Sequence, residues 1–210
     1  MPLMKTLAPQ AAALPPAPNA LDATLAQLAA GDAAVRRAAA HALAADAPAN
    51  QAQAVPALAE ALDTERDHAV SSAILGTLAA IATEESVSVL ARCLRSEDAW
   101  LRNAAIEALR ALPAQVAPVM AHLLVDWDRD VRILAVGILD TLRHERVEEW
   151  LLQLIDADGD VNVCGAALDV LADIATGAAH GPVERLLARF PDEPYLRFAG
   201  DLLLGRLEQA

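Results

Sequence analysis

Six segments of the chain share one pattern of acidic and apolar positions, which returns every 30 to 35 residues. In each segment an acidic residue stands three positions before an aliphatic residue, and a leucine stands eight positions after the aliphatic residue. The aliphatic residues, which we call anchors, are Val35, Val70, Leu101, Val131, Val163 and Leu196. Further apolar residues mostly stand three, four and eleven positions after the anchor, so they fall on one side of a helix with 3.6 residues per turn. The pattern predicts six amphipathic helices.

The acidic residue three positions before each anchor stands where a helix N-cap belongs. A carboxylate there can accept hydrogen bonds from free backbone N–H groups and complements the helix dipole. The residues at this position are Asp32, Asp67, Asp98, Asp128, Asp160 and Glu193. We therefore expect each anchor helix to begin just after its acidic residue.

A second helix is predicted upstream of each anchor helix, because apolar stretches with paired leucines lie there. These stretches cover residues 21–30, 51–62, 84–94, 114–125, 145–155 and 182–190. The short connections favour antiparallel helix hairpins, and a period near 30 is typical of stacked helix pairs. The fold class is therefore all-α, a right-handed α-α superhelix (solenoid) of about six helix pairs, in one domain of residues 20–210. Residues 1–19, rich in alanine and proline, are expected to be a flexible tail.

The repeats resemble those of the HEAT family, in the short bacterial form named for phycobilisome lyases. The resemblance rests on the segment from Asp32 to Leu43 and on the segments that begin at Asp98 and Asp128. The family favours arginine directly after the anchor, and Arg36, Arg102, Arg132 and Arg197 match it, whereas Ser71 and Cys164 do not. The resemblance implies that these arginines join acidic residues in a ladder between neighbouring repeats, interrupted in repeats two and five. Family members serve as scaffolds, lyase subunits and, in a few cases, enzymes.

The charge of the chain restricts its partners. The formal net charge is −13, and Lys5 is the only lysine. A duplex nucleic acid or an anionic membrane surface would be repelled on average, so we expect neither as a partner. No apolar run approaches the 18 residues of a membrane span. Cys93 and Cys164 form no CxxC pair, which suits a reducing compartment, and we expect a cytoplasmic protein.

Candidate chemistry is sparse. The five histidines occupy unrelated repeat positions, so no pair has the spacing of metal ligands on a helix face. The deoxyhypusine hydroxylases, which resemble this fold, bind iron through several His-Glu dipeptides, but this chain has only His144–Glu145. No glycine-rich phosphate loop or nucleophile motif occurs. We therefore expect no metal, no cofactor and no enzymatic activity.

A partner site is predicted where the anchor helices turn away from the core, since these positions hold small and apolar residues instead of many charges. The expected floor is Ile133, Val136, Gly137, Gly165 and Leu168, and the expected rim is Arg102, Asn103, Glu107, Arg110, Arg132, Asp140 and Asp169. Two explanations remain open: a docking groove on the concave side, or burial of the floor between neighbouring anchor helices. Trp100 and Trp127 lie near the turns, where they either contact a partner or cover the ends of their own hairpins.

The last repeat holds Phe190, Tyr195 and Phe198, and these large side chains are expected to close the end of the core. The predicted function is a non-catalytic scaffold or adaptor that binds a protein partner in the concave groove and assists assembly of a complex. The alternative, which the family resemblance implies, is a phycobilin-lyase-like subunit or a cofactor-maturation chaperone. The sequence leaves the identity of the partner and the oligomeric state open.

Overall fold

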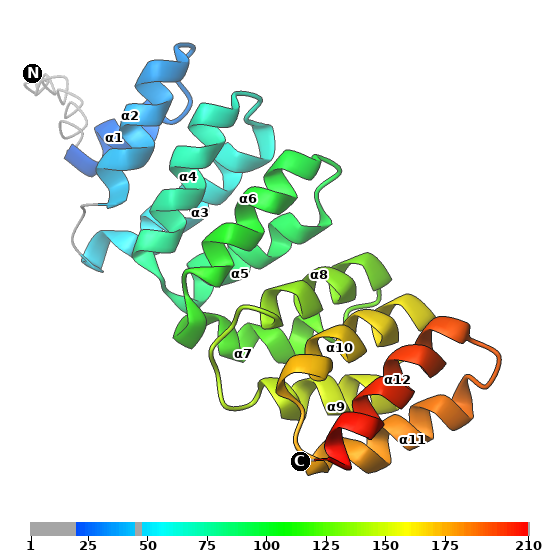
Figure 1. Ribbon diagram of the computed structural model, residues 1–210. Coiled ribbons are helices and arrows are strands. Elements are labelled where there is room, and N and C mark those ends of the chain that lie inside the picture. The colour runs from blue at the N-terminus through cyan, green and yellow to red at the C-terminus, as the bar shows by residue number, and fades with distance from the viewer. Residues whose placement is uncertain (1–19, 45–47, 210) are drawn as a thin grey trace, which may run out of the picture.

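A computed structural model describes residues 20–44 and 48–209 of the chain (Figure 1). Within these residues it contains twelve α-helices, two short 3-10 helices and no strand. The predicted tail of residues 1–19 lies outside the described residues. The α-helices form six successive pairs: α1 (Ala20–Gln27) with α2 (Ala33–Ala44), α3 (Pro48–Thr64) with α4 (His68–Ile81), α5 (Glu84–Arg92) with α6 (Ala99–Arg110), α7 (Pro113–Leu123) with α8 (Arg129–Leu139), α9 (Val147–Ala157) with α10 (Val161–Ile174), and α11 (His180–Arg189) with α12 (Pro194–Leu207).

The pairs stack into a solenoid, as the sequence predicted. The anchor helices α2, α4, α6, α8, α10 and α12 form one layer, and the first helices of the pairs form the other (Figure 1). Neighbouring anchor helices pack directly on one another, but the contact between α6 and α8 is less extensive than that between α2 and α4. The stack is visibly offset at this point, between the third and fourth pairs (Figure 1). None of the described helices is both long and apolar enough to cross a membrane.

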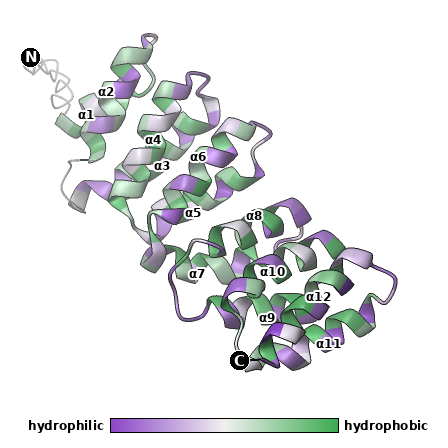
Figure 2. Cartoon of the chain, viewed as in Figure 1, coloured by the Kyte–Doolittle hydropathy of each residue, from purple (hydrophilic) through white to green (hydrophobic). Residues whose placement is uncertain are grey.

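The acidic N-caps form as predicted in five of the six anchor helices. In each of the five, a side-chain oxygen accepts a hydrogen bond from the backbone N–H two residues later, at N···O distances of 2.7–2.9 Å. The exception is Glu193, whose side chain makes no capping bond; Pro194 follows it at the first turn of α12. A proline there has a backbone angle suited to the helix start and lacks the N–H that would need a partner. The turns within the pairs, where the caps stand, are largely hydrophilic (Figure 2).

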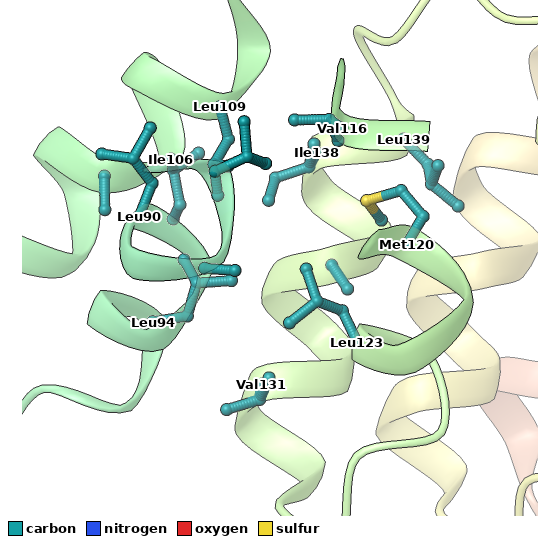
Figure 3. Packing of buried hydrophobic residues seen from close by; sticks show 14 of the residues in the cluster. Leu90, Leu94, Ile106, Leu109, Val116, Met120, Leu123, Val131, Ile138 and Leu139 are labelled. Carbon is teal, nitrogen blue, oxygen red and sulfur yellow. The ribbon is translucent and has the colours of Figure 1, made fainter. Parts of the chain in front are cut away.

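The core runs the length of the stack between the two layers. The anchors Val70, Val131, Val163 and Leu196 are buried, as are the leucines eight positions after the first five anchors. Figure 3 shows this packing at the third and fourth pairs, where Leu90 and Leu109 lie on one side and Met120 and Leu139 on the other. A further apolar position, five residues after the anchor, is buried between neighbouring anchor helices in each of the first five pairs. In α12 this position is Asp201, which is exposed.

The last pair differs from the prediction. Phe190 packs partly against the core, but Tyr195 and Phe198 are exposed and do not close it. The core-facing positions of α12 are filled by Leu196, Gly200 and Leu203 instead. Gly200 packs closely, because a Cβ atom there would lie 2.8 Å from Leu187 Cδ2 and the leucine side chain would have to shift. The aromatic side chains are therefore left on the surface of α12.

Candidate functional site

In five of the six pairs, the side chain directly after the anchor bonds to the turn that precedes its helix. Where this residue is arginine, its guanidinium donates a hydrogen bond to the backbone carbonyl six residues earlier in the chain. The pairs are Arg36 with Ala30, Arg102 with Ser96, Arg132 with Asp126, and Arg197 with Pro191, at 2.9, 2.6, 2.8 and 3.4 Å. In the fifth pair, the Cys164 thiol makes the equivalent contact with the Asp158 carbonyl at 3.5 Å. The position therefore stabilises the hairpin turns.

Two of the arginines also link neighbouring pairs, as the family resemblance implied. Arg36 donates to both carboxylate oxygens of Glu65, at 2.7 and 2.9 Å, and Arg132 does the same to Asp158, at 2.6 and 3.1 Å. The hydrogen bonds that the two guanidinium groups donate to these carboxylates raise the pKa of both arginines. Arg102 makes no such bond among the described residues, because the equivalent carboxylate, Asp126, binds Arg95.

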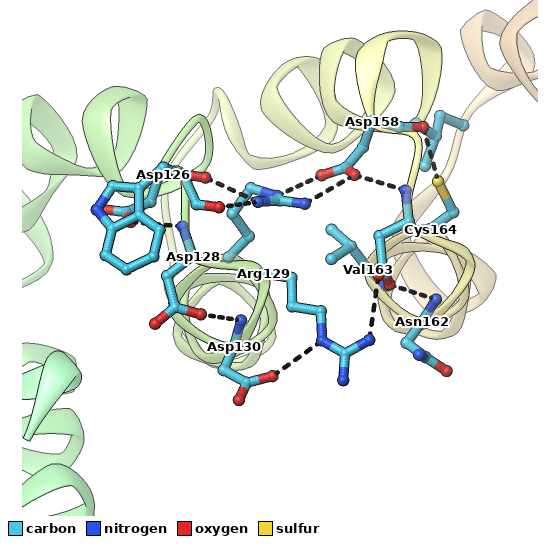
Figure 4. Close-up of polar contacts among 12 residues, drawn as sticks. Asp126, Asp128, Arg129, Asp130, Asp158, Asn162, Val163 and Cys164 are labelled. Carbon is cyan, nitrogen blue, oxygen red and sulfur yellow. Dashed lines mark hydrogen bonds and ion pairs between the residues drawn. The ribbon is translucent and has the colours of Figure 1, made fainter. Parts of the chain in front are cut away.

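These bonds hold the loop between α7 and α8 in one conformation. Arg132 binds the carbonyl oxygens of Asp126 and Trp127, and the Asp126 carboxylate accepts a hydrogen bond from the Asp128 backbone N–H at 3.0 Å. Arg95 binds the same carboxylate from the preceding pair. Figure 4 shows Asp126, Asp128 and Asp158 within this network. The loop is therefore bound by arginines from two successive helix pairs, and Arg132 also joins it to Asp158 of the following pair.

Two large apolar side chains flank the buried Asp126 and point to solvent. Val125 is 77% exposed and Trp127 is 84% exposed. Asp126 between them is buried, and its carboxylate and carbonyl are both bound by arginines. Tryptophan is enriched at the energetic centres of protein interfaces. The loop thus presents two exposed apolar side chains on a hydrogen-bonded backbone.

A hollow of about 460 Å³ lies beside this loop, between α7 and α9. Its apolar wall includes Leu124, Val125, Leu154 and the ring of Trp150, and its polar residues include Arg146 and Gln153. Trp150 is buried and held in place, since its ring stacks on His144 at 5.0 Å and lies under the Arg146 guanidinium at 5.0 Å. Val125 belongs both to the hollow and to the exposed pair. We call the hollow together with Val125 and Trp127 the Trp127 site.

The two tryptophans of the predicted site, Trp100 and Trp127, lie in different surroundings. The Trp100 ring stacks on His68 of the preceding pair, with 4.2 Å between ring centres and 6° between planes, and His68 Nε2 lies 3.3 Å from the Asp98 carboxylate. Trp100 therefore covers the junction of the second and third hairpins. Trp127 is 84% exposed and stacks on no ring of the described residues, and its role in partner binding stays a prediction.

The residues of the predicted floor differ in how deeply they are buried. Val136, Gly165 and Leu168 are buried, so for these three residues the structure shows burial between anchor helices. A Cβ atom on Gly165 would lie 3.2 Å from the Tyr195 ring, so only glycine fits there without a shift. Ile133 and Gly137 are half-buried. A Cβ atom on Gly137 would contact nothing within 4 Å, so no backbone approaches it closely.

The predicted rim remains at the surface in part. Asn103, Glu107, Asp140 and Asp169 are exposed, whereas Arg102, Arg110 and Arg132 are half-buried. Arg110 reaches across the offset in the stack and donates to the Gly137 carbonyl at 2.7 Å, and it pairs with Glu107 at 2.9 Å. Arg102 and Ile133 line one hollow between the third and fourth pairs. The structure thus brings these two together, and the role of the whole predicted set in partner binding stays a prediction.

Sequence reasoning missed the exposure of Val125 and that of a second set, a group of apolar residues on α12. Val125 ends an apolar run that was assigned to a first helix, and its exposure could not be seen in the sequence. The second group, Tyr195, Phe198 and Leu202, shares one face of α12. Its spacing of three and four residues was visible, but the same spacing marks a core stripe. Among the described residues, no group of three or more histidine, cysteine or acidic side chains is arranged to hold a metal ion.

Comparison with known proteins agrees with the repeat architecture. Residues 21–110, which span the first three helix pairs, match the family model for HEAT repeats. This confirms the resemblance to HEAT repeats over those pairs. No curated protein matches the chain significantly.

Three solved structures illustrate what the chain is similar to. An archaeal HEAT-like repeats protein from Thermococcus onnurineus NA1 is 15% identical, with 90% of this chain and 87% of that chain covered and a TM-score of 0.48. Human deoxyhypusine hydroxylase, in complex with glycerol, is 17% identical, with 92% and 86% covered and a TM-score of 0.46. The complex of CpcE and CpcF of phycocyanin lyase from Nostoc sp. PCC7120 is 18% identical, with 96% and 100% covered and a TM-score of 0.39. Because the identities are below 25% and the TM-scores below 0.5, these similarities carry no argument about the activity of this chain.

Proposed function

We propose that this solenoid is a non-catalytic scaffold that binds a segment of a partner protein at the Trp127 site. The observation that carries the proposal is the 84% exposure of Trp127 on a loop fixed by Arg95 and Arg132. A large apolar side chain gains free energy when it is removed from water, and here the loop needs no ordering before it binds. The partner therefore meets a preformed surface.

The hollow beside Trp127 indicates what the partner segment presents. Its walls are mainly apolar and include Val125, so it suits a bulky aliphatic or aromatic side chain of the segment, while Trp127 offers a second apolar contact on the adjoining loop. Arg146 and Gln153 stand among the apolar residues and can donate hydrogen bonds to carbonyl groups of the segment. An apolar anchor with a few polar contacts around it is the usual composition of a binding hot spot.

The state of the two cysteines supports a non-catalytic role. Cys93 and Cys164 are both buried. Burial raises the pKa of the Cys93 thiol to about 11 and also raises the pKa of Cys164. A thiol acts as a nucleophile through its thiolate, which is scarce at neutral pH when the pKa is raised. Both cysteines are better suited to packing than to covalent catalysis.

Selection from a random peptide library displayed on phage tests the proposal without knowledge of the natural partner. Peptides are selected on the wild-type chain and their affinities are measured for Trp127→Ser and for Ile174→Ser. Ile174 is the matched control, because it is an exposed apolar residue on α10, outside the Trp127 site. We expect the Trp127 substitution to weaken binding about 30-fold, the effect of losing one hot-spot residue, and the control to leave it unchanged. Peptides that bind both variants equally well would contradict the proposal.

A further inference from the structure

One face of α12 carries an apolar stripe that nothing in the described chain covers. Tyr195, Phe198 and Leu202 are 51%, 69% and 63% exposed, and their spacing of three and four residues aligns them along the helix. The buried residues of this helix, Leu196, Gly200 and Leu203, lie outside the stripe, and α12 packs on α10 and α11. Three exposed large apolar residues in a row are uncommon on a helix surface and mark an interaction site.

The stripe is held in position at its first residue. The Tyr195 ring lies against Gly165 of α10, and its hydroxyl donates a hydrogen bond to the Asp169 carboxylate of the same helix. The ring therefore cannot fold away from solvent. Because α12 is a regular helix in this part, Phe198 and Leu202 extend the surface that Tyr195 begins.

Two opposite charges flank the stripe on one side, one helical turn apart. Arg197 and Asp201 are both exposed. Arg197 makes one long hydrogen bond, 3.4 Å to the Pro191 carbonyl, and neither side chain forms an ion pair within the described residues. The arginines at the same repeat position in the first and fourth pairs each bind a carboxylate of the following pair. Arg197 is thus ready to bind a carboxylate supplied from outside the chain.

We infer that two copies of this chain pair through α12, antiparallel about a two-fold axis. Phe198 then lies near the axis, Tyr195 packs against the partner's Leu202, and Arg197 faces the partner's Asp201. The two-fold axis brings the same flank of both helices together, so one contact between Arg197 and Asp201 is made twice. A parallel arrangement would place Arg197 level with the same arginine of the second copy. The charges therefore select the antiparallel arrangement.

The size of the surface sets the expected strength. Aromatic side chains bury about 150–250 Å² each, so the three stripe residues offer roughly 500 Å² per copy at most. Stable interfaces bury about 800 Å² per partner. The net charge of −13 on each copy opposes association further. We expect a dimer that dissociates reversibly, with a dissociation constant in the range of about 10–100 μM.

Sedimentation velocity over a series of concentrations tests this inference on the full chain. The wild type is expected to shift from monomer to dimer as its concentration rises towards about 100 μM. Phe198→Glu is expected to remain monomeric, because it places two carboxylates near the axis. Ile174→Glu introduces the same charge at an exposed apolar residue elsewhere and should dimerise as the wild type does. A wild type that stays monomeric, or a Phe198→Glu variant that dimerises like the wild type, overturns the inference.

A charge exchange tests the antiparallel arrangement. Arg197→Glu and Asp201→Arg, made singly, place like charges opposite one another, and each is expected to weaken the dimer at least about tenfold. The double variant restores opposite charges across the interface and should recover the dimer. Failure of the double variant to recover it, with circular dichroism showing an intact helix, refutes this arrangement. The inference is independent of the proposed function, so Trp127→Ser should dimerise normally.

Discussion

Replacing Glu65 with glutamine removes the carboxylate that joins the first two helix pairs. In the wild type this carboxylate accepts two hydrogen bonds from Arg36, at 2.7 and 2.9 Å. It accepts two more from the backbone N–H groups of Arg66 and Asp67, both at 2.8 Å. The side chain is only 5% exposed. Glutamine has nearly the same shape but carries no charge. Its amide has only one acceptor oxygen, so it cannot accept all four hydrogen bonds.

The expected loss of stability follows from the pKa of this group. The hydrogen bond from Arg36, more than any other contact, lowers the Glu65 pKa from 4.5 to about 2. A shift of this size corresponds to roughly 3 kcal/mol at neutral pH as an upper bound. Arg36 is partly exposed to water, which screens the pair, so we expect Glu65→Gln to cost about 1.5 kcal/mol.

The lowered pKa of Glu65 also determines how its contribution to stability changes with pH. Because the folded state lowers the pKa, the carboxylate stabilises the fold above its unfolded pKa of 4.5 and loses this effect as the pH falls towards about 2. The difference in unfolding free energy between wild type and Glu65→Gln should therefore be largest near neutral pH. By about pH 3, more than half of it should be gone.

Urea unfolding followed by circular dichroism measures this difference at several pH values. The matched control is Asp63→Asn, which removes a carboxylate that also pairs with an arginine, but on exposed side chains. Such surface pairs contribute little, so the control should change stability by less than about 0.5 kcal/mol. If Glu65→Gln and wild type lose stability in parallel between neutral and acidic pH, the reasoning about this carboxylate is refuted.

Five further substitutions test the packing and the helix N-caps. Gly76→Ala should raise stability by up to about 1 kcal/mol, because Gly76 lies in a helix and its added Cβ atom meets open space. Gly200→Ala should bring no gain, because its Cβ atom meets a neighbouring leucine. The midpoints of urea unfolding compare the two variants. Asp128→Ala should cost about 1 kcal/mol through its lost N-cap, and Glu193→Ala, which has no capping bond, should cost less in the same assay. Ile133→Glu charges a half-buried side chain packed on the core and should lower the thermal midpoint; an unchanged midpoint with lost partner binding would instead favour the concave groove.

Local chemistry in the sequence was sufficient to locate the helix pairs. The acidic residue three positions before an anchor and the apolar residues after it act within one or two helical turns, so their effect survives in any context. Both helices of every pair were expected where the structure has them, and five of the six acidic residues accept capping bonds. The exception, Glu193, precedes a proline, which starts the helix without a side-chain cap.

Packing between pairs could not be derived in the same way. Val136 and Leu168 were assigned to a possible groove because they point away from the core stripe of their own helices. They are buried because a neighbouring anchor helix lies against them. Their burial depends on the distance and angle between helices, which the sequence period does not specify. The reverse error occurred at Phe198, where an apolar residue expected to close the core lies on an uncovered face.

The sequence by itself determined the repeat, the helix boundaries, the caps and the acidic character that disfavours polyanionic partners, because each of these depends on residues close together in the chain or on the summed charge. The tertiary structure alone decided which apolar side chains reach solvent. Trp127 stands on a loop that is bound around Asp126 by Arg95 and Arg132, from different helix pairs. The stripe on α12 is exposed because, apart from the contact of Tyr195 with α10, no described helix packs against it. Exposure is a property of neighbours in space, and those neighbours are fixed only when the pairs stack.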